Sequence, residues 1–137
     1  MYHFGVTLSF FMEFVMVPIK PRISVEYAEN ATIVTFTDEK ILEERDIQAL
    51  QESIMSVIEQ ADHLNMILDF CNVSFLSSAV LGLLIRISKK VYERQGQLKL
   101  CKINPKIYEI FKITRLTNIF DIYPDLKSAA ESLSASD

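Results

Sequence analysis

The sequence predicts a single α/β domain with a mixed β-sheet, in which an opening hairpin is followed by alternating helices and strands. Two observations lead to this prediction. Two strand-like segments follow each other directly, and after them the spacing of apolar residues alternates between helical and strand periods. Alternating helices and strands imply parallel strands joined by right-handed crossovers, whereas a hairpin adds an antiparallel strand. A chain of 137 residues is long enough to bury the core of one such domain.

The opening hairpin is predicted within residues 22–37. Residues 22–28 alternate between apolar and polar side chains, which is typical of a half-buried strand. Glu29 and Asn30 provide a two-residue turn. Residues 31–37 are rich in β-branched and aromatic side chains and return as the second strand.

A helix is predicted from residues 43–46 to about residue 61, because an acidic first turn precedes a stripe of apolar side chains. The stripe consists of Ile47, Leu50, Ile54, Val57, Ile58 and Ala61. Residues 66–70 form a short apolar run with polar neighbours, which indicates a buried strand. A second helix starts at Ser77 or Ser78 and ends near Arg94, with Gly96 as its C-terminal stop signal.

The last third of the chain continues the alternation. Residues 98–103 are predicted to form a strand, and Asn104 followed by Pro105 then starts a short helix. Ile107, Ile110 and Phe111 are predicted to form the buried face of that helix. After a loop at residues 114–118, residues 119–123 form the last strand, and Pro124 and Asp125 start a final helix that ends at Leu133.

Residues 1–17 are strongly apolar and form an N-terminal extension. The apolar stretch has no Lys or Arg before it within this segment, and Glu13 interrupts it. The segment therefore resembles neither a signal peptide nor a membrane span. We predict two parts, an N-terminal extension at residues 1–20 and a domain at residues 21–134. The extension is expected to form an extra strand or helix that packs on the domain. The extension either covers a sheet edge or mediates a homodimer. A biological start at Met12 or Met16 is the alternative.

Net charge and cysteine content limit the expected partners and location of the protein. The formal net charge is −4, so the chain has no general attraction to phosphate backbones and nucleic acid is not an expected partner. The two cysteines, Cys71 and Cys101, each lie beside an apolar run and are predicted to be buried, reduced thiols. Because nothing indicates an oxidising compartment, a cytoplasmic location is expected.

The sequence also lacks the usual signatures of an enzyme. His3 and His63 are its only histidines, no Cys or His spacing suits a metal ion, and no glycine-rich phosphate loop is present. No G-x-S-x-G elbow surrounds a serine, and His63 is predicted to be an exposed loop residue. Asp69 is expected to hydrogen-bond nearby backbone at a strand end. We therefore predict no catalytic residues, no metal and no cofactor.

The loop at residues 71–78 is the predicted functional region. It follows the carboxyl end of the buried strand, where sites in such sheets tend to lie, and it ends at the start of a helix. Ser77 or Ser78 is expected to cap that helix. The alternative role is phosphorylation, because a helix N-terminus tolerates an added anion that a docked partner does not.

Three segments resemble the STAS domain, the family of bacterial anti-sigma factor antagonists. Residues 68–82 (LDFCNVSFLSSAVLG) resemble the family pattern D-L-x-x-V-x-F-[ILM]-D-S-S-G-L-G. Residues 94–105 (RQGQLKLCKINP) and 113–123 (ITRLTNIFDIY) resemble the segments that follow it. The resemblance covers residues 21–133 and departs from the pattern at three positions, where Ser77, Ala79 and Val80 replace Asp, Ser or Thr, and Gly.

The resemblance implies a partner-switching regulator that binds an anti-sigma factor with serine kinase activity. By position it assigns phosphorylation to Ser78, with Ser77 as the alternative acceptor. The implied partner-binding residues are Phe75, Leu76, Ser77, Ser78, Ala79, Val80, Leu81 and Leu84. An unphosphorylated scaffold or subunit of a larger signalling assembly is the second hypothesis, and a small serine-dependent hydrolase is the third.

Overall fold

The structure is a computed structural model that describes residues 22–61 and 64–135. A five-stranded mixed sheet forms its centre, in the order β1 (Ile23–Tyr27), β2 (Thr32–Phe36), β4 (Met66–Asp69), β6 (Leu98–Cys101) and β7 (Asp121–Tyr123). β1 is antiparallel to β2, and the remaining neighbours are parallel. The predicted α/β architecture with its opening hairpin is confirmed. The predictions for residues 1–20, His3 and His63 fall outside the described residues.

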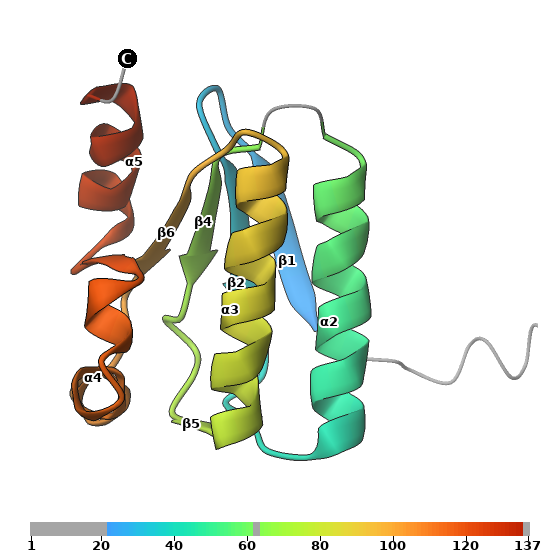
Figure 1. Cartoon of the computed structure of the whole chain (residues 1–137), viewed down its shortest axis with the longest axis vertical. Helices are drawn as coiled ribbons and strands as arrows, with labels where there is room; N and C mark the ends of the chain where they lie inside the picture. The colour runs from blue at the N-terminus through green and yellow to red at the C-terminus, as the bar shows by residue number, and fades with distance from the viewer. Residues whose placement is uncertain (1–21, 62–63, 136–137) are drawn as a thin grey trace, which may run out of the picture.

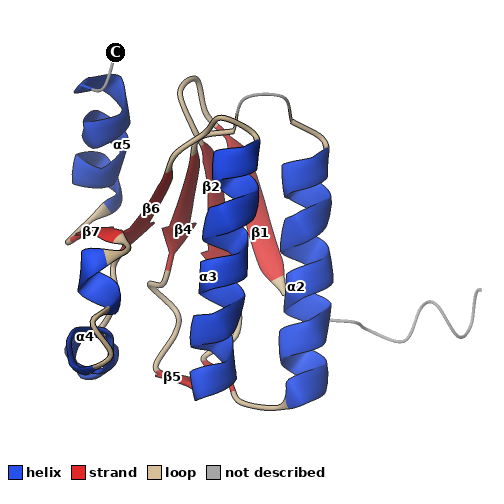
Figure 2. Cartoon of the chain, viewed as in Figure 1, coloured by secondary structure: helices blue, strands red, loops and turns tan. Residues whose placement is uncertain are grey.

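Helices cover both faces of the sheet. α2 (Glu44–Glu59) and α3 (Ser78–Glu93) lie side by side on one face (Figure 1). α5 (Leu126–Ala135) packs on the other face, against β4, β6 and β7. α4 (Pro105–Ile113) and the 3₁₀ turn η1 (Leu116–Asn118) connect β6 to β7, as Figure 2 shows by type of element.

Alternation along the central strands divides the core between these two layers. Met66 and Leu68 join the larger cluster under α2 and α3, whereas Ile67 joins a smaller cluster under α5. All four residues of β4 are buried, because a strand with helices on both sides exposes neither face. This explains why residues 66–68 are all apolar instead of alternating with polar residues.

Several element boundaries differ from the prediction. The short strands β3 (Lys40–Ile41) and β5 (Phe75–Leu76) pair in parallel, although no strand was predicted at either position. The strand predicted at 98–103 stops at Cys101, because Lys102 adopts a left-handed φ of 57°. The last strand begins at Asp121 because η1 precedes it. Ile110 is 39% exposed, so its predicted burial is wrong, and Ile107 and Phe111 alone form the buried face of α4.

The glycine at the end of α3 has a different role from the predicted helix stop signal. Gln95, not Gly96, takes the left-handed conformation, with φ of 58°. The N–H groups of Gln95 and Gly96 donate to the carbonyls of Tyr92 and Val91, a Schellman-type ending. A Cβ at Gly96 would lie 1.5 Å from the carbonyl oxygen of Leu64. Gly96 is therefore required by a close backbone approach.

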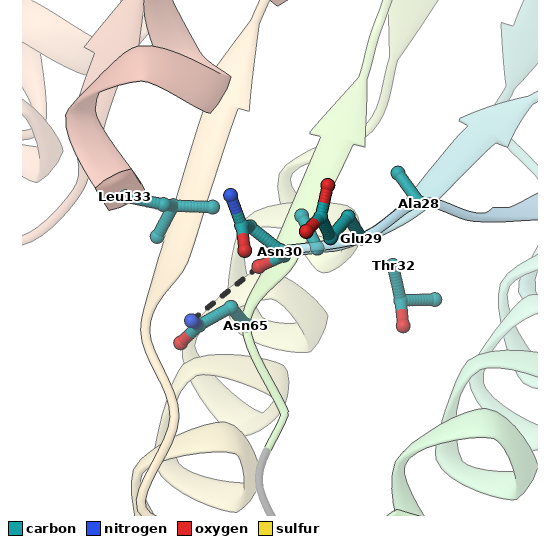
Figure 3. A pocket seen from close by; sticks show the side chains of 7 residues that line it. Ala28, Glu29, Asn30, Thr32, Asn65 and Leu133 are labelled. Carbon is teal, nitrogen blue, oxygen red and sulfur yellow. Dashed lines mark hydrogen bonds between the residues drawn. The ribbon is translucent and has the colours of Figure 1, made fainter.

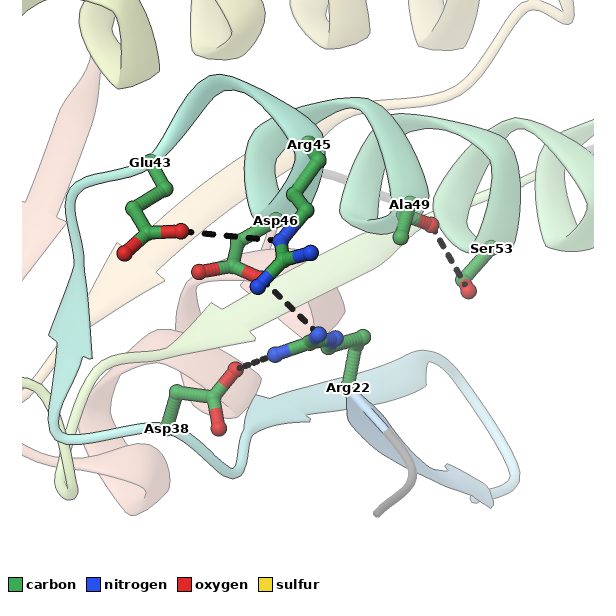
Figure 4. A network of polar contacts seen from close by, with 7 residues as sticks. All are labelled: Arg22, Asp38, Glu43, Arg45, Asp46, Ala49 and Ser53. Carbon is green, nitrogen blue, oxygen red and sulfur yellow. Dashed lines mark hydrogen bonds and ion pairs between the residues drawn. The ribbon is translucent and has the colours of Figure 1, made fainter. Parts of the chain in front are cut away.

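An ion network fixes β1 to the start of α2 (Figure 4). The Arg22 guanidinium donates to Asp38 and to Asp46, each at 2.9 Å. Arg22 is about one-third exposed, so solvent screens these contacts and their contribution to stability is modest. Their geometric effect is to connect the first strand, the loop after β2 and the first turn of α2.

Asp125 caps α5 and makes it sensitive to acid. Its Oδ1 accepts the Ser128 N–H at 2.8 Å, and this bond, with a second from the Ser128 hydroxyl, lowers the pKa of the carboxyl below 3.8. Because the pKa of Asp125 is lower in the folded than in the unfolded state, its ionised carboxylate stabilises the fold above the unfolded-state pKa. This stabilisation is lost as the pH falls through the folded-state pKa.

We expect Asp125→Ala to lower the thermal midpoint at neutral pH, and the difference from wild type to shrink below about pH 3.8. Thermal melts over a pH series test this, with Glu131→Ala on the same helix as the control; a difference that persists in acid would contradict it.

Candidate functional site

The segment between β4 and α3 lies beyond the carboxyl ends of the parallel strands, at the lower end of α3 in Figure 1. It begins with a turn in which Asp69 Oδ1 accepts the Cys71 N–H at 2.9 Å, as predicted for Asp69. Asn104 then donates from Nδ2 to the Val73 carbonyl at 3.2 Å. Backbone bonds from Ser74 and Phe75 to the Glu39 carbonyl hold β5 beside β3. The loop is thus fixed from three directions.

The two serines have different environments. Ser77 is the N-cap residue of α3, but its side chain makes no capping bond. Its Oγ is buried and is the one such side-chain atom without a hydrogen-bond partner in the described part of the chain. Ser78 is the first residue of α3 and is exposed. The predicted start of the helix is therefore confirmed, but the predicted capping hydrogen bond from a serine side chain at Ser77 is absent. Of the two hydroxyl groups, that of Ser78 is the accessible one.

Burial divides the predicted partner-binding residues into two groups. Phe75 is 48% exposed, Ala79 is exposed, and Leu76 is half-buried. Val80 and Leu84 are 0% exposed and Leu81 is 8% exposed, because these side chains pack into the core under α3. Val80, Leu81 and Leu84 therefore offer little surface in this structure, and the partner contacts that the resemblance implies for them stay a prediction.

The backbone at the start of α3 favours an anion, while the acidic Glu44 of α2 lines the same hollow as Ser77 and Ala79. The first turn of α3 contains no acidic residue, and its backbone N–H groups point toward the N-terminus. Nearby, Lys40 Nζ lies 5.5 Å from the centre of the exposed Phe75 ring, a cation–π contact. The surface thus combines an exposed aromatic ring, a lysine and an accessible serine.

A groove beside this surface runs between α2 and α3. It has a volume of about 510 Å³. Leu42 and Ile47 line it on one side, and Ser77, Ala79, Gly82 and Arg86 on the other. Sequence reasoning did not identify this groove, because its two walls come from helices separated by a strand and a loop.

A second hollow lies at the opposite end of the sheet (Figure 3). It measures about 300 Å³ and is formed by the β1–β2 turn, Asn65 and Leu133. The amide of Asn65 accepts the Gln97 N–H at 3.0 Å and donates to the Asn30 carbonyl at 3.5 Å. Because these polar groups are already engaged within the fold, they serve to join the turn to β4 and β6.

The two cysteines differ in accessibility. Cys101 is buried as predicted, whereas Cys71 is exposed, so the predicted burial of Cys71 is wrong. Burial raises the pKa of the Cys101 thiol to about 12. Desolvation, followed by the Asp69 carboxylate, raises that of Cys71. Because the thiolate is the reactive form, both are weak nucleophiles.

We expect iodoacetamide to add one label to the native protein, slowly and at Cys71, and a second label only after denaturation. Intact-mass measurement counts the labels, and Cys71→Ser, which should remain unlabelled until denatured, is the control. Two labels on the folded protein would contradict the burial of Cys101.

The described residues contain no cluster of three His, Cys, Asp or Glu side chains that could hold a metal ion. Within residues 22–61 and 64–135, no helix has both the length and the apolar composition of a membrane span. The site consists of an exposed serine, an exposed aromatic ring and a groove between α2 and α3.

The family follows from comparison with known proteins. The family model of the STAS domain matches residues 22–129, and the chain belongs to that family. The anti-sigma-B factor antagonist of Bacillus subtilis is 29% identical over 101 residues, which cover 74% of this chain and 89% of the relative.

Two solved structures show the same fold. An anti-sigma-factor antagonist (STAS) domain protein from Planctomyces limnophilus has a TM-score of 0.75 at 21% identity and covers 82% of this chain and 97% of its own. The Bacillus cell fate determinant SpoIIAA in its phosphorylated form has a TM-score of 0.60 at 14% identity and covers 80% of this chain and 98% of its own.

Proposed function

We propose that this protein is an anti-sigma factor antagonist that works by partner switching in the bacterial cytoplasm. Its partner is an anti-sigma factor with serine kinase activity, which docks over the start of α3. The observation that supports this most is the exposure of Ser78 at a helix N-terminus, beside the half-exposed ring of Phe75. Sequence relatives named as anti-sigma factor antagonists support the same role.

Phosphorylation of Ser78 controls this docking. A phosphate adds about −1.5 to −2 charges at neutral pH, which the unsatisfied N–H groups of α3 accommodate. A partner packed on Phe75 and Ser78 meets a bulky, strongly hydrated anion instead of a small hydroxyl. The modified protein therefore folds normally and releases its partner.

The direct test is phosphate mapping after incubation with ATP and the switch kinase encoded nearest to this gene. We expect phosphate on Ser78 in the wild type and in Ser77→Ala, and none in Ser78→Ala. Ser77→Ala is the matched control because it removes the neighbouring hydroxyl, whose oxygen is buried. A wild-type protein that binds the kinase but acquires no phosphate would overturn the switch and leave a binding role.

The second candidate is a STAS scaffold or subunit of a larger assembly that is not phosphorylated. It is favoured by the substitutions around Ser78: Ser77 offers no carboxylate, and Val80 carries a β-branched side chain where the family pattern has glycine. A serine-dependent hydrolase has less support. Within the described chain, neither Ser77 nor Ser78 has a hydrogen-bonded general base.

A further inference from the structure

We propose that the groove between α2 and α3 is a specificity pocket for the anti-sigma partner. It takes one apolar side chain of the partner, which packs on the bare helix surface at Gly82, and a carboxylate, which pairs with Arg86. This inference rests on the proposed function, because it names the chemistry by which the partner of Ser78 is recognised.

Gly82 provides the first argument. A glycine inside a helix costs roughly 0.5–1 kcal/mol relative to alanine, so its presence calls for a reason. The fold gives none: outside its own helix backbone, a Cβ at Gly82 would meet only Arg86 Nη1, at an ordinary contact distance of 3.7 Å. Gly82 also lies one helical turn beyond Ser78, on nearly the same face. A partner that reaches Ser78 thus encounters a helix surface without a side chain.

The lining of the groove is mixed, with Gln48 and Gln51 among its polar residues, and its apolar part suits one apolar side chain. Leu42 is 50% exposed at its rim, and Ile47 and Ala79 contribute further apolar surface. A half-exposed leucine beside a hollow of about 510 Å³ gains burial when a side chain enters. The groove continues directly from Ser77 and Ala79, which flank the accessible hydroxyl.

Charge sets the orientation of the occupant. Arg86 donates from Nη2 to the neutral Gln51 amide oxygen at 2.8 Å in an exposed contact. It makes no ion pair with any described residue, so its guanidinium is available for a bidentate carboxylate. The acidic Glu44 lines the end of the groove at the first turn of α2. A partner carboxylate therefore lies at the Arg86 end, away from Glu44.

Two substitutions test the two halves of this pocket. Gly82→Ala adds one methyl group where the occupant packs, and Arg86→Ala removes the cation. With the kinase that phosphorylates Ser78 as the probe, we expect each to weaken binding about tenfold or more in a calorimetric titration. Arg86→Ala should also reduce the salt dependence of binding. Lys127→Ala, which removes an exposed cation from α5 on the other face of the sheet, is the control.

The folded state of Gly82→Ala is verified by its thermal midpoint, which should equal or exceed that of the wild type. If the wild type binds the kinase and acquires phosphate on Ser78, yet Gly82→Ala binds equally well, the pocket is wrong and the proposed function stands. If Arg86→Ala binds as tightly as wild type, the partner supplies no carboxylate there. If the wild type forms no complex at all, both proposals fail together.

Discussion

Replacing Ser78 with glutamate is expected to leave the protein folded and to weaken its complex with the proposed anti-sigma partner about 30-fold or more, which corresponds to roughly 2 kcal/mol. The fold tolerates the change because Ser78 is exposed and the first turn of α3 contains no acidic residue. A carboxylate at a helix N-terminus is favourable by about 0.3–1 kcal/mol, so the thermal midpoint should hold or rise slightly. The partner, in contrast, must desolvate a charge to dock.

The neutral variant Ser78→Gln separates charge from size, because glutamine nearly matches glutamate in shape. If charge controls docking, Ser78→Gln retains most of the affinity that Ser78→Glu loses. Binding is measured by titration and folding by thermal melts of the same samples. Equal affinities of wild type and Ser78→Glu would place the docking surface away from the start of α3.

The sequence predicts the main elements of this fold because local and tertiary preferences agree in them. In β4, three consecutive buried apolar residues precede the buried Asp69, and an apolar run of that kind is visible without a structure. The start of α4 is similarly clear, because Asn104 Oδ1 accepts the Ile107 N–H at 2.9 Å and Pro105 occupies the first helical position. Each of these signals lies within a few residues.

The features that the sequence did not reveal depend on contacts between distant segments. β3 and β5 have two residues each, and they pair only because the chain brings Ile41 beside Leu76. At the site, Leu84 and Phe75 are both apolar near Ser78, yet one is 0% and the other 48% exposed. Spacing along α3 identifies an apolar face, and only the position of the sheet determines that this face is the core. The groove beside it requires α2, which lies far away in sequence.

The largest effect on stability is expected from Gly96→Ala, which should reduce the free energy of unfolding by about 3 kcal/mol. The added Cβ would lie 1.5 Å from the Leu64 carbonyl oxygen and 2.3 Å from its carbonyl carbon. Relief requires a backbone shift, and the neighbouring backbone is fixed. The Asn65 carbonyl accepts the Thr32 N–H at 2.8 Å, and Asn65 Oδ1 accepts the Gln97 N–H at 3.0 Å. Moving Leu64 therefore strains the attachment of β4 to both neighbouring strands.

Gly82→Ala is the matched control, since it makes the same chemical change in a helix where the new methyl group has room. It should raise the free energy of unfolding by roughly 0.5–1 kcal/mol, the usual cost of glycine inside a helix. Urea titrations of the two variants and the wild type measure both effects, and an unchanged slope shows that a shift of the midpoint reports a change in stability. If Gly96→Ala were as stable as Gly82→Ala, then the close approach of α3's end to Leu64 would not exist in solution. The position of Gly96 would in that case reflect only the end of the helix, a role that Gln95 already fulfils with its left-handed φ of 58°.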